Sequence, residues 1–152
     1  MSNRHWTQSY GSIPKEINPD AHASVLQLME EAMQRYAERP ALRCFGQTLS
    51  YADVDRLSGA FAAYLQNEVG VKKGDRVAVM LPNLPAFGIA MLGILRAGAA
   101  QVNVNPLYTP RELEHQLNDA GSQVIVVFGG STPTLAEIVA STPVKTIITV
   151  DL

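Results

Sequence analysis

Two short apolar runs decide the fold of this chain: VAVML at residues 77–81 and VIVVF at residues 124–128. Each is nearly continuous in its apolar character and rich in valine, which is typical of a strand buried on both faces of a parallel sheet. Around them, helices are expected over 84–97, 110–119 and 135–139, and further strands over 102–104 and 146–150. This alternation predicts an α/β domain, in which a mostly parallel sheet is flanked by helices and joined by right-handed crossovers.

A helix is also expected in the first quarter of the chain. It begins at Ser24, which together with Gln27 resembles a capping box, and it continues up to Pro40. Its apolar stripe is expected to face the core and consists of Val25, Leu28, Met29, Ala32, Met33 and Tyr36.

A short β-hairpin near the start of the chain is expected to pair residues 41–45 with residues 48–51. Its turn is placed at residues 46–47, because glycine supplies the positive φ that a tight turn needs. A second helix is expected to begin near Ser50 and to end before Gly70. Its inward-facing residues are expected to be Val54, Leu57, Phe61, Tyr64 and Leu65.

Residues 1–20 are expected to form an irregular amino-terminal arm, because Gly11, Pro14 and Pro19 interrupt regular elements there. The remaining residues, 21–152, make up the α/β domain. No apolar stretch followed by a small-residue cleavage site occurs near the start. No secretory signal is therefore predicted, and the expected location is the cytoplasm.

Composition limits the classes of function. The 152 residues carry a formal net charge of −2, with 47% hydrophobic and 17% charged residues, which is the profile of a soluble globular domain. Basic residues are scattered, with Lys72 and Lys73 as the longest run, so no nucleic-acid partner is expected. The single cysteine, Cys44, lies in an expected strand and is interpreted as a small core hydrophobic residue rather than a nucleophile.

Few side chains are candidates for chemistry, and each has a structural interpretation. Asp53 and Asp55 lie two residues apart on an expected helix and point to different sides, which argues against a catalytic pair. The GGST segment at residues 129–132 has the glycines and hydroxyls of an anion cradle but no lysine, so a turn followed by a helix N-cap is favoured. Glu112 and His115 have metal-ligand spacing on one helix but no second copy, so an exposed polar face is favoured.

Two stretches resemble core motifs of the acyl-adenylate-forming enzymes, a superfamily that includes acyl-CoA synthetases, firefly luciferase and the adenylation domains of peptide synthetases. The sequence LSYADV at residues 49–54 resembles the first core motif, and LRAGAA at residues 95–100 resembles the second. The segments KGDRV at residues 73–77 and MLPN at residues 80–83 lie between them, in the order that the superfamily has.

Two further stretches narrow the resemblance to bacterial long-chain fatty-acid–CoA ligases of the FadD kind. They are INPD at residues 17–20 and NVNPLYTPREL at residues 103–113, and the similarity loosens after Gly121. The resemblance implies an enzyme that uses ATP and magnesium to convert a long-chain fatty acid to an acyl-adenylate, releasing pyrophosphate. It implies that the acyl group is then transferred to coenzyme A. It also allows for peripheral association with the inner membrane and for a homodimer contacted by the early arm.

The same resemblance implies that this chain is a fragment, the partial amino-terminal domain of the adenylate-forming fold. The family's phosphate loop ending in a lysine, its adenine-binding and acid motifs, and its carboxyl-terminal domain with a catalytic lysine have no counterpart here. Residues 129–132 are not that loop, because its flanking tyrosine and lysine are missing. We therefore expect no catalytic, cofactor-binding or metal-binding residue in this chain, no ligand bound to it, and no activity of the chain alone.

Two alternatives stay open at this point. The longer protein could be another adenylating enzyme, such as an aryl-acid or short-chain-acid ligase. The chain could instead be a complete, small flavodoxin-like binding module, since the alternation of strands and helices closes at Val150. A natural stop after Leu152 favours the module, whereas a phosphate-loop sequence downstream favours the ligase.

Overall fold

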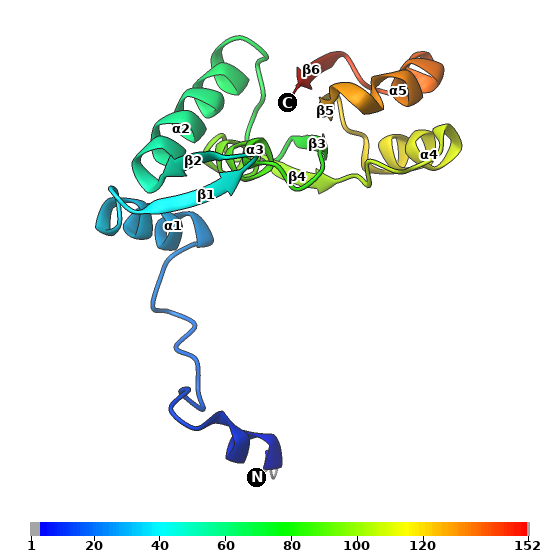
Figure 1. Ribbon diagram of the computed structural model, residues 1–152. Helices are drawn as coiled ribbons and strands as arrows, with labels where there is room; N and C mark the ends of the chain where they lie inside the picture. The colour runs from blue at the N-terminus through cyan, green and yellow to red at the C-terminus, as the bar shows by residue number, and fades with distance from the viewer. Residues whose placement is uncertain (1–3, 152) are drawn as a thin grey trace.

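Four strands in the order β4-β3-β5-β6 form the central sheet of the computed structural model, which describes residues 4–151 (Figure 1). They are β3 (Arg76–Met80), β4 (Ala100–Asn103), β5 (Val124–Phe128) and β6 (Thr146–Val150). All neighbouring pairs are parallel, and in their register Val77 lies opposite Val124, which lies opposite Thr146. The predicted parallel sheet is confirmed, and β5 and β6 have the predicted bounds.

Two pairs of helices cover the two faces of this sheet (Figure 1). One face is covered by α2 (Tyr51–Asn67) and α3 (Pro85–Arg96), and the other by α4 (Pro110–Ala120) and α5 (Thr132–Ile138). In β3, Val77 and Val79 pack on the side of α2 and α3. Ala78 and Met80 pack on the opposite side, because the side chains of a strand alternate between faces. None of the helices within residues 4–151 is long and apolar enough to cross a membrane.

Outside the layer of α2 and α3 lie α1 (Val25–Arg35) and an antiparallel hairpin of β1 (Pro40–Cys44) and β2 (Gln47–Ser50). A third apolar cluster joins α1 to this layer, and it is centred on Met33, Val54 and Leu92. The hairpin packs against the same cluster through Leu42 and Leu49. The first third of the chain is therefore attached to the sheet through α2 and α3.

The hairpin turn lies one residue earlier than the sequence predicts. Cys44 is paired with Gln47, so the two turn residues are Phe45 and Gly46, with φ angles of 46° and 79°. Positive φ at both positions is the pattern of a type I′ turn, whose twist matches that of the two strands. The prediction placed the turn at residues 46–47 because it assigned the positive φ to glycine alone.

Three apolar residues that are expected to face the core are exposed instead: Val25 by 66%, Leu28 by 45% and Tyr64 by 43%. The helix α1 also ends at Arg35, well before Pro40. Val25 and Leu28 are exposed because α1 packs against α2 and α3 along one side only, where Met33 is 2% exposed. A stripe as wide as the predicted one is therefore only partly covered.

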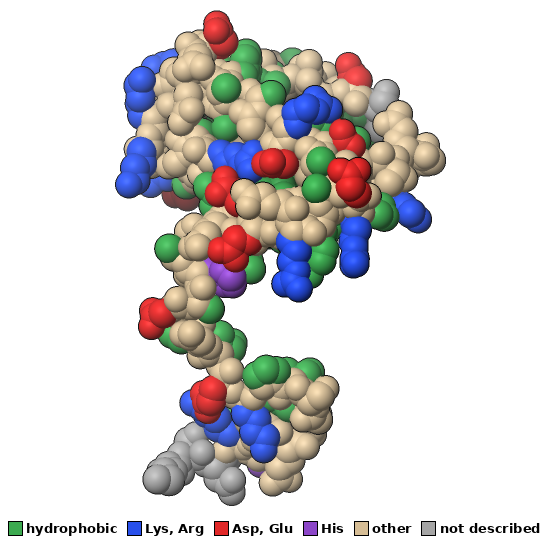
Figure 2. Space-filling view, turned by 90° about the vertical axis from the view of Figure 1, so that its left-hand side faces the viewer, with side chains coloured by type: hydrophobic (Ala, Val, Ile, Leu, Met, Phe, Trp, Pro, Cys, Tyr) green, Lys and Arg blue, Asp and Glu red, His purple; other side chains and the backbone are tan. Residues whose placement is uncertain are grey.

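The amino-terminal arm projects away from the body (Figures 1 and 2). It carries a short 3-10 helix, His5–Tyr10, which the sequence pattern does not predict. An ion pair of 3.0 Å between Arg4 and Glu16 closes this part of the arm into a loop. No residue from 4 to 24 is buried, so the arm contributes nothing to the apolar clusters of the body.

Candidate functional site

The carboxyl edge of a parallel sheet is where ligands bind in folds of this type, because the loops that follow the strands meet there. A hollow of about 330 Å³ opens at this edge, between the hairpin turn, the start of α3 and the end of β6. It is lined by Cys44, Phe45, Gln47, Leu84, Pro85, Ala86, Val150 and Asp151. Its position makes it the first candidate for a binding site.

The hollow offers little polar chemistry. Its polar side chains are the Cys44 thiol, the Gln47 amide and the Asp151 carboxylate, and no lysine or arginine lines it. Cys44 is free and half-buried, so it lies at a surface depression rather than in the core as predicted. Residues 4–151 also contain no group of three or more His, Cys, Asp or Glu side chains that could hold a metal ion. The hollow is therefore an apolar surface without a charged ligand set.

The GGST segment at residues 129–132 follows β5 at the same edge, and its hydroxyl groups are already engaged. The Thr132 hydroxyl donates to the backbone oxygen of Gly129 at 2.7 Å, and the Ser131 hydroxyl donates to a backbone oxygen in the loop after β4 at 3.4 Å. The Asp151 carboxylate lies so close to Gly129 that a β-carbon there would overlap it. The expected turn is confirmed, and Ser131 occupies the N-cap position of α5, although its side chain makes no capping hydrogen bond.

Two of the candidate carboxylates cap helices. Asp53 accepts the Ser50 hydroxyl at 2.7 Å and the Ser50 N–H at 3.1 Å, in a capping box at the start of α2. These hydrogen bonds lower the pKa of Asp53 below its usual value, because they stabilise the charged carboxylate. Glu112 forms the equivalent box with Thr109 at the start of α4, and hydrogen bonds from Thr109 lower its pKa in the same way. Glu112 and His115 are both exposed, as expected for a polar face.

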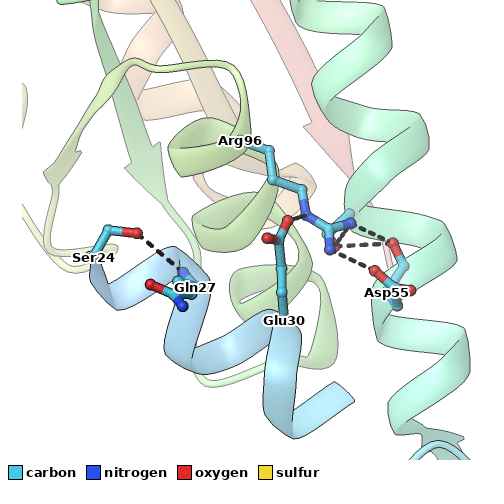
Figure 3. Close-up of polar contacts among 6 residues, drawn as sticks. Ser24, Gln27, Glu30, Asp55 and Arg96 are labelled. Atoms are coloured by element: carbon cyan, nitrogen blue, oxygen red, sulfur yellow. Dashed lines mark hydrogen bonds and ion pairs between the residues drawn. The ribbon is translucent and has the colours of Figure 1, made fainter. Parts of the chain in front are cut away.

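A nearly buried guanidinium joins α1, α2 and α3 on one side of the sheet (Figure 3). One terminal nitrogen of Arg96 donates to the backbone oxygen of Asp55 at 2.7 Å and to the Ser58 hydroxyl at 3.1 Å. The other terminal nitrogen forms an ion pair with the Asp55 carboxylate. Glu30 of α1 lies 3.5 Å from Nε as a second acidic partner, without a hydrogen bond. Asp55 is therefore the partner of Arg96 and shares no site with Asp53.

The sequence analysis missed this cluster, although the sequence contains two features that point to it. Arg96 directly follows the most apolar segment of the chain, residues 86–95. A charge at the end of a buried helix needs a partner, because an unpaired buried charge is costly. Asp55, an acidic residue on the preceding helix, supplies that partner in the structure.

Residues of the two superfamily motifs make structural contacts. The motif at residues 95–100 supplies the Arg96 guanidinium and a turn at Gly98, whose φ is 76°. The motif at residues 49–54 supplies the cap of α2. Neither motif brings a nucleophile or a metal ligand to the hollow at the carboxyl edge. Figure 2 shows acidic and basic side chains interspersed on the face of α1 and α2, with no stripe of one sign.

Comparison with known proteins agrees with the resemblance. The family described as AMP-binding enzyme matches residues 29–152. A long-chain-fatty-acid–CoA ligase from Salmonella typhimurium is 49% identical over 144 residues, which are 94% of this chain and 26% of the relative. The chain thus spans about a quarter of the length of the relative that it matches.

Solved structures agree on the fold. An anthranilate CoA ligase in complex with anthranoyl-AMP has a TM-score of 0.79 and 21% identity, over 82% of this chain and 24% of that one. A long-chain-fatty-acid-CoA ligase from Archaeoglobus fulgidus has a TM-score of 0.77 and 24% identity, over 84% of this chain and 27% of that one. At these identities the structural likeness establishes the fold alone.

Proposed function

This chain belongs to the AMP-binding enzyme family, and from that premise we propose that it is the amino-terminal part of a bacterial long-chain fatty-acid–CoA ligase. The observation that carries the proposal is the 49% identity to the Salmonella typhimurium ligase over 94% of the chain. The longer protein converts a long-chain fatty acid, ATP and CoA to acyl-CoA, AMP and pyrophosphate through an acyl-adenylate.

Within that enzyme, the described residues act as scaffold. They do not fit a nucleotide or a magnesium ion, because no basic side chain lines the hollow and the hydroxyls of residues 131 and 132 are bonded to backbone oxygens. We therefore place the catalytic groups, and the binding of ATP, magnesium and CoA, in the part of the longer protein that this chain does not cover. Residues 21–152 then form an incomplete amino-terminal domain, and residues 1–20 form its arm.

Location and assembly are further parts of the proposal. We place the enzyme in the cytoplasm, acting in lipid metabolism, with peripheral association with the inner membrane. We also propose a homodimer in which the arm contacts the second subunit. Flotation with phospholipid vesicles tests the membrane association, and light scattering of the longer protein with and without residues 1–20 tests the dimer.

The substrate class is tested on the longer protein with two acids. AMP formation is measured with ATP and CoA, in the presence of palmitate or of benzoate. We expect palmitate to drive AMP formation and benzoate to leave it at background. Turnover of benzoate without turnover of palmitate would assign the enzyme to an aryl-acid branch and refute the proposal.

The scaffold role is tested by exchange of segments between relatives. In this experiment the residues of this chain replace the matched region of the Salmonella typhimurium ligase, with which they share 49% identity. We expect the chimaera to form palmitoyl-CoA, because about half of the residues in the exchanged segment are identical. A chimaera that melts cooperatively but forms no palmitoyl-CoA contradicts the proposal.

A further inference from the structure

The tip of the β1–β2 hairpin carries a residue that neither its backbone nor its surroundings favour. Phe45 is the one non-glycine residue with a positive φ within residues 4–151, at 46°. It is also 81% exposed, so little burial compensates for this conformation. Asparagine would fit the same turn better, since Asn-Gly is the preferred type I′ pair. A large apolar side chain at such a position indicates a contact with something outside the described residues.

Three arginines precede this tip in the chain, and none of them has an acidic partner. Arg35 ends α1, Arg39 directly precedes β1, and Arg43 lies within β1. All three are exposed, and no ion pair within residues 4–151 includes them. The segment from 35 to 48 has a single acidic residue, Glu38, so it is positively charged in a chain whose net charge is −2.

The fold presents these arginines outward without neutralising them. The guanidinium of Arg35 lies 5.4 Å from the centre of the Tyr36 ring, and that of Arg39 lies 5.0 Å from it. A guanidinium stacked on a ring keeps the N–H groups at its edge free to bind phosphate oxygens. Arg43 points away from the body, because its neighbour Leu42 packs into the apolar cluster beneath the hairpin. Figure 2 shows basic side chains extending from the lower border of the body, next to the arm.

An apolar tip combined with unpaired cations fits the surface of an anionic membrane. Elements that bind there insert an apolar side chain at the boundary between headgroups and acyl chains, while cations contact the anionic headgroups. The residues that follow Phe45 in the hairpin, Gln47 and Thr48, are exposed and polar. The core of a protein–protein interface is a broader apolar area with few charges, which this hairpin does not offer. The charge and the single apolar tip therefore favour a lipid surface.

We propose that the outer side of the β1–β2 hairpin contacts anionic phospholipids, with Phe45 inserted at the boundary between headgroups and acyl chains. The three arginines at positions 35, 39 and 43 bind the headgroup phosphates around it. This inference rests on the proposed membrane association and names the part of the chain that carries it. The strained turn is then explained, because the Phe45 side chain becomes buried when the bilayer is bound.

Flotation of the longer protein with phospholipid vesicles tests this surface. Vesicles of phosphatidylcholine are compared with vesicles that also contain phosphatidylglycerol, and we expect binding to the anionic vesicles that weakens as salt is added. Phe45→Asn should weaken this binding about tenfold, although it favours the turn, and Arg43→Gln should weaken it about fivefold. The matched controls are Leu107→Asn and Lys72→Gln, which change exposed side chains in the loops after β4 and before β3 and should leave binding unchanged.

Insertion of the tip is tested by fluorescence of the 152-residue chain, which has one tryptophan, Trp6. In the double variant Trp6→Phe/Phe45→Trp, the tryptophan at position 45 is the sole reporter. We expect it to be quenched by anionic vesicles whose acyl chains carry bromine, because bromine quenches tryptophan on contact. The control is Trp6→Phe/Leu107→Trp, whose fluorescence should stay unchanged. Equal fluorescence at position 45 with brominated and with ordinary anionic vesicles overturns the proposal.

The outcomes separate the hairpin surface from the membrane association itself. A longer protein that floats with neither kind of vesicle refutes the membrane association and the hairpin surface together. A longer protein that floats, with Phe45→Asn and Arg43→Gln binding as tightly as the parent sequence, overturns the hairpin surface alone. If Phe45→Asn instead lowers the melting temperature of the longer protein and leaves binding unchanged, Phe45 makes a contact within the ligase, which also overturns the proposal.

Discussion

The Arg96 guanidinium donates to the backbone oxygen of Asp55 at 2.7 Å, although the two residues lie 41 positions apart. The same side chain pairs with the Asp55 carboxylate and is 14% exposed, whereas the Asp55 side chain is 48% exposed. Arg96 therefore fixes α3 against α2 at the point where the second family motif begins. The Asp55 carboxylate remains partly exposed to water, so breaking this ion pair costs less than breaking one between two buried charges.

Breaking the ion pair between Arg96 and Asp55 should destabilise the chain. For Asp55→Ala we expect a loss of about 2 kcal/mol in the free energy of unfolding, because a nearly buried guanidinium is left without its carboxylate. Glu30→Gln is the matched control and should change stability by less than about 0.5 kcal/mol, since Glu30 is 43% exposed and lies 3.5 Å from Nε. Urea unfolding followed by circular dichroism measures both. A larger loss for Glu30→Gln than for Asp55→Ala contradicts the assignment of the main partner.

Two glycines of α3 should respond differently to alanine. A β-carbon at Gly93 would lie 2.7 Å from the Phe61 ring and 3.0 Å from the Ser58 backbone oxygen. Gly93→Ala should therefore separate α2 from α3 and cost about 1–3 kcal/mol. At Gly88 the nearest atom is the end of the Leu42 side chain at 3.4 Å, so Gly88→Ala should be neutral or stabilising by up to about 1 kcal/mol through helix propensity. Similar effects of the two substitutions would show that α2 and α3 are not in close contact at Gly93.

The order of strands and helices was predictable because the two central strands, β3 and β5, are apolar on both faces and each helix has its own period. The capping box of Ser50 and Asp53 was also predictable, since it depends on neighbouring residues. Features that depend on contacts between distant segments of the chain were not predictable from the sequence. Tyr64 follows the inward-facing period of its helix, yet no element within residues 4–151 covers it, and it is 43% exposed. The pairing of Arg96 with Asp55 likewise depends on how two helices pack, which a sequence pattern does not specify.

The same limit applies to the candidate site. The pattern at residues 129–132 shows glycines and hydroxyls but not their partners. Only the fold places the Asp151 carboxylate against Gly129 and turns the Thr132 hydroxyl back to the backbone. The position of the hollow follows from the sheet order, whereas its apolar lining depends on the approach of the hairpin turn.

The hairpin turn should be improved by asparagine. Phe45 has a φ of 46° and is 81% exposed, so its side chain gains little from burial while its backbone occupies a region that favours asparagine and glycine. Phe45→Asn should stabilise the chain by about 0.5–1 kcal/mol, because Asn-Gly is the preferred type I′ turn. Phe45→Ala keeps the unfavourable φ and serves as the control. If calorimetry finds Phe45→Asn less stable than Phe45→Ala, the described turn geometry is wrong.

The capping box of α2 should make stability depend on pH below neutrality. Hydrogen bonds from Ser50 hold the pKa of Asp53 below its usual 3.8, so their contribution is present above that pH. It is lost as the pH falls through the lowered pKa of the folded state, because the protonated carboxyl no longer accepts both bonds. Ser50→Ala should therefore lower the melting temperature at pH 7 by about 2–4 °C.

The control for this prediction is to compare Ser50→Ala with the parent sequence at neutral and at acidic pH. The difference between Ser50→Ala and the parent sequence should shrink as the pH is lowered below 3.8, the usual pKa of the Asp53 carboxyl. Melting curves at pH 7 and in acid measure it. A difference that grows on acidification reverses the expected sign and refutes the link to Asp53.

The central claim is that this chain is scaffold of an adenylate-forming ligase and lacks its catalytic groups. The most direct measurement is palmitate-dependent exchange of pyrophosphate into ATP, carried out in parallel with the 152-residue chain and with the longer protein. We predict exchange by the longer protein and none by the chain alone. Exchange catalysed by the chain alone, or none by the longer protein with palmitate, contradicts the account.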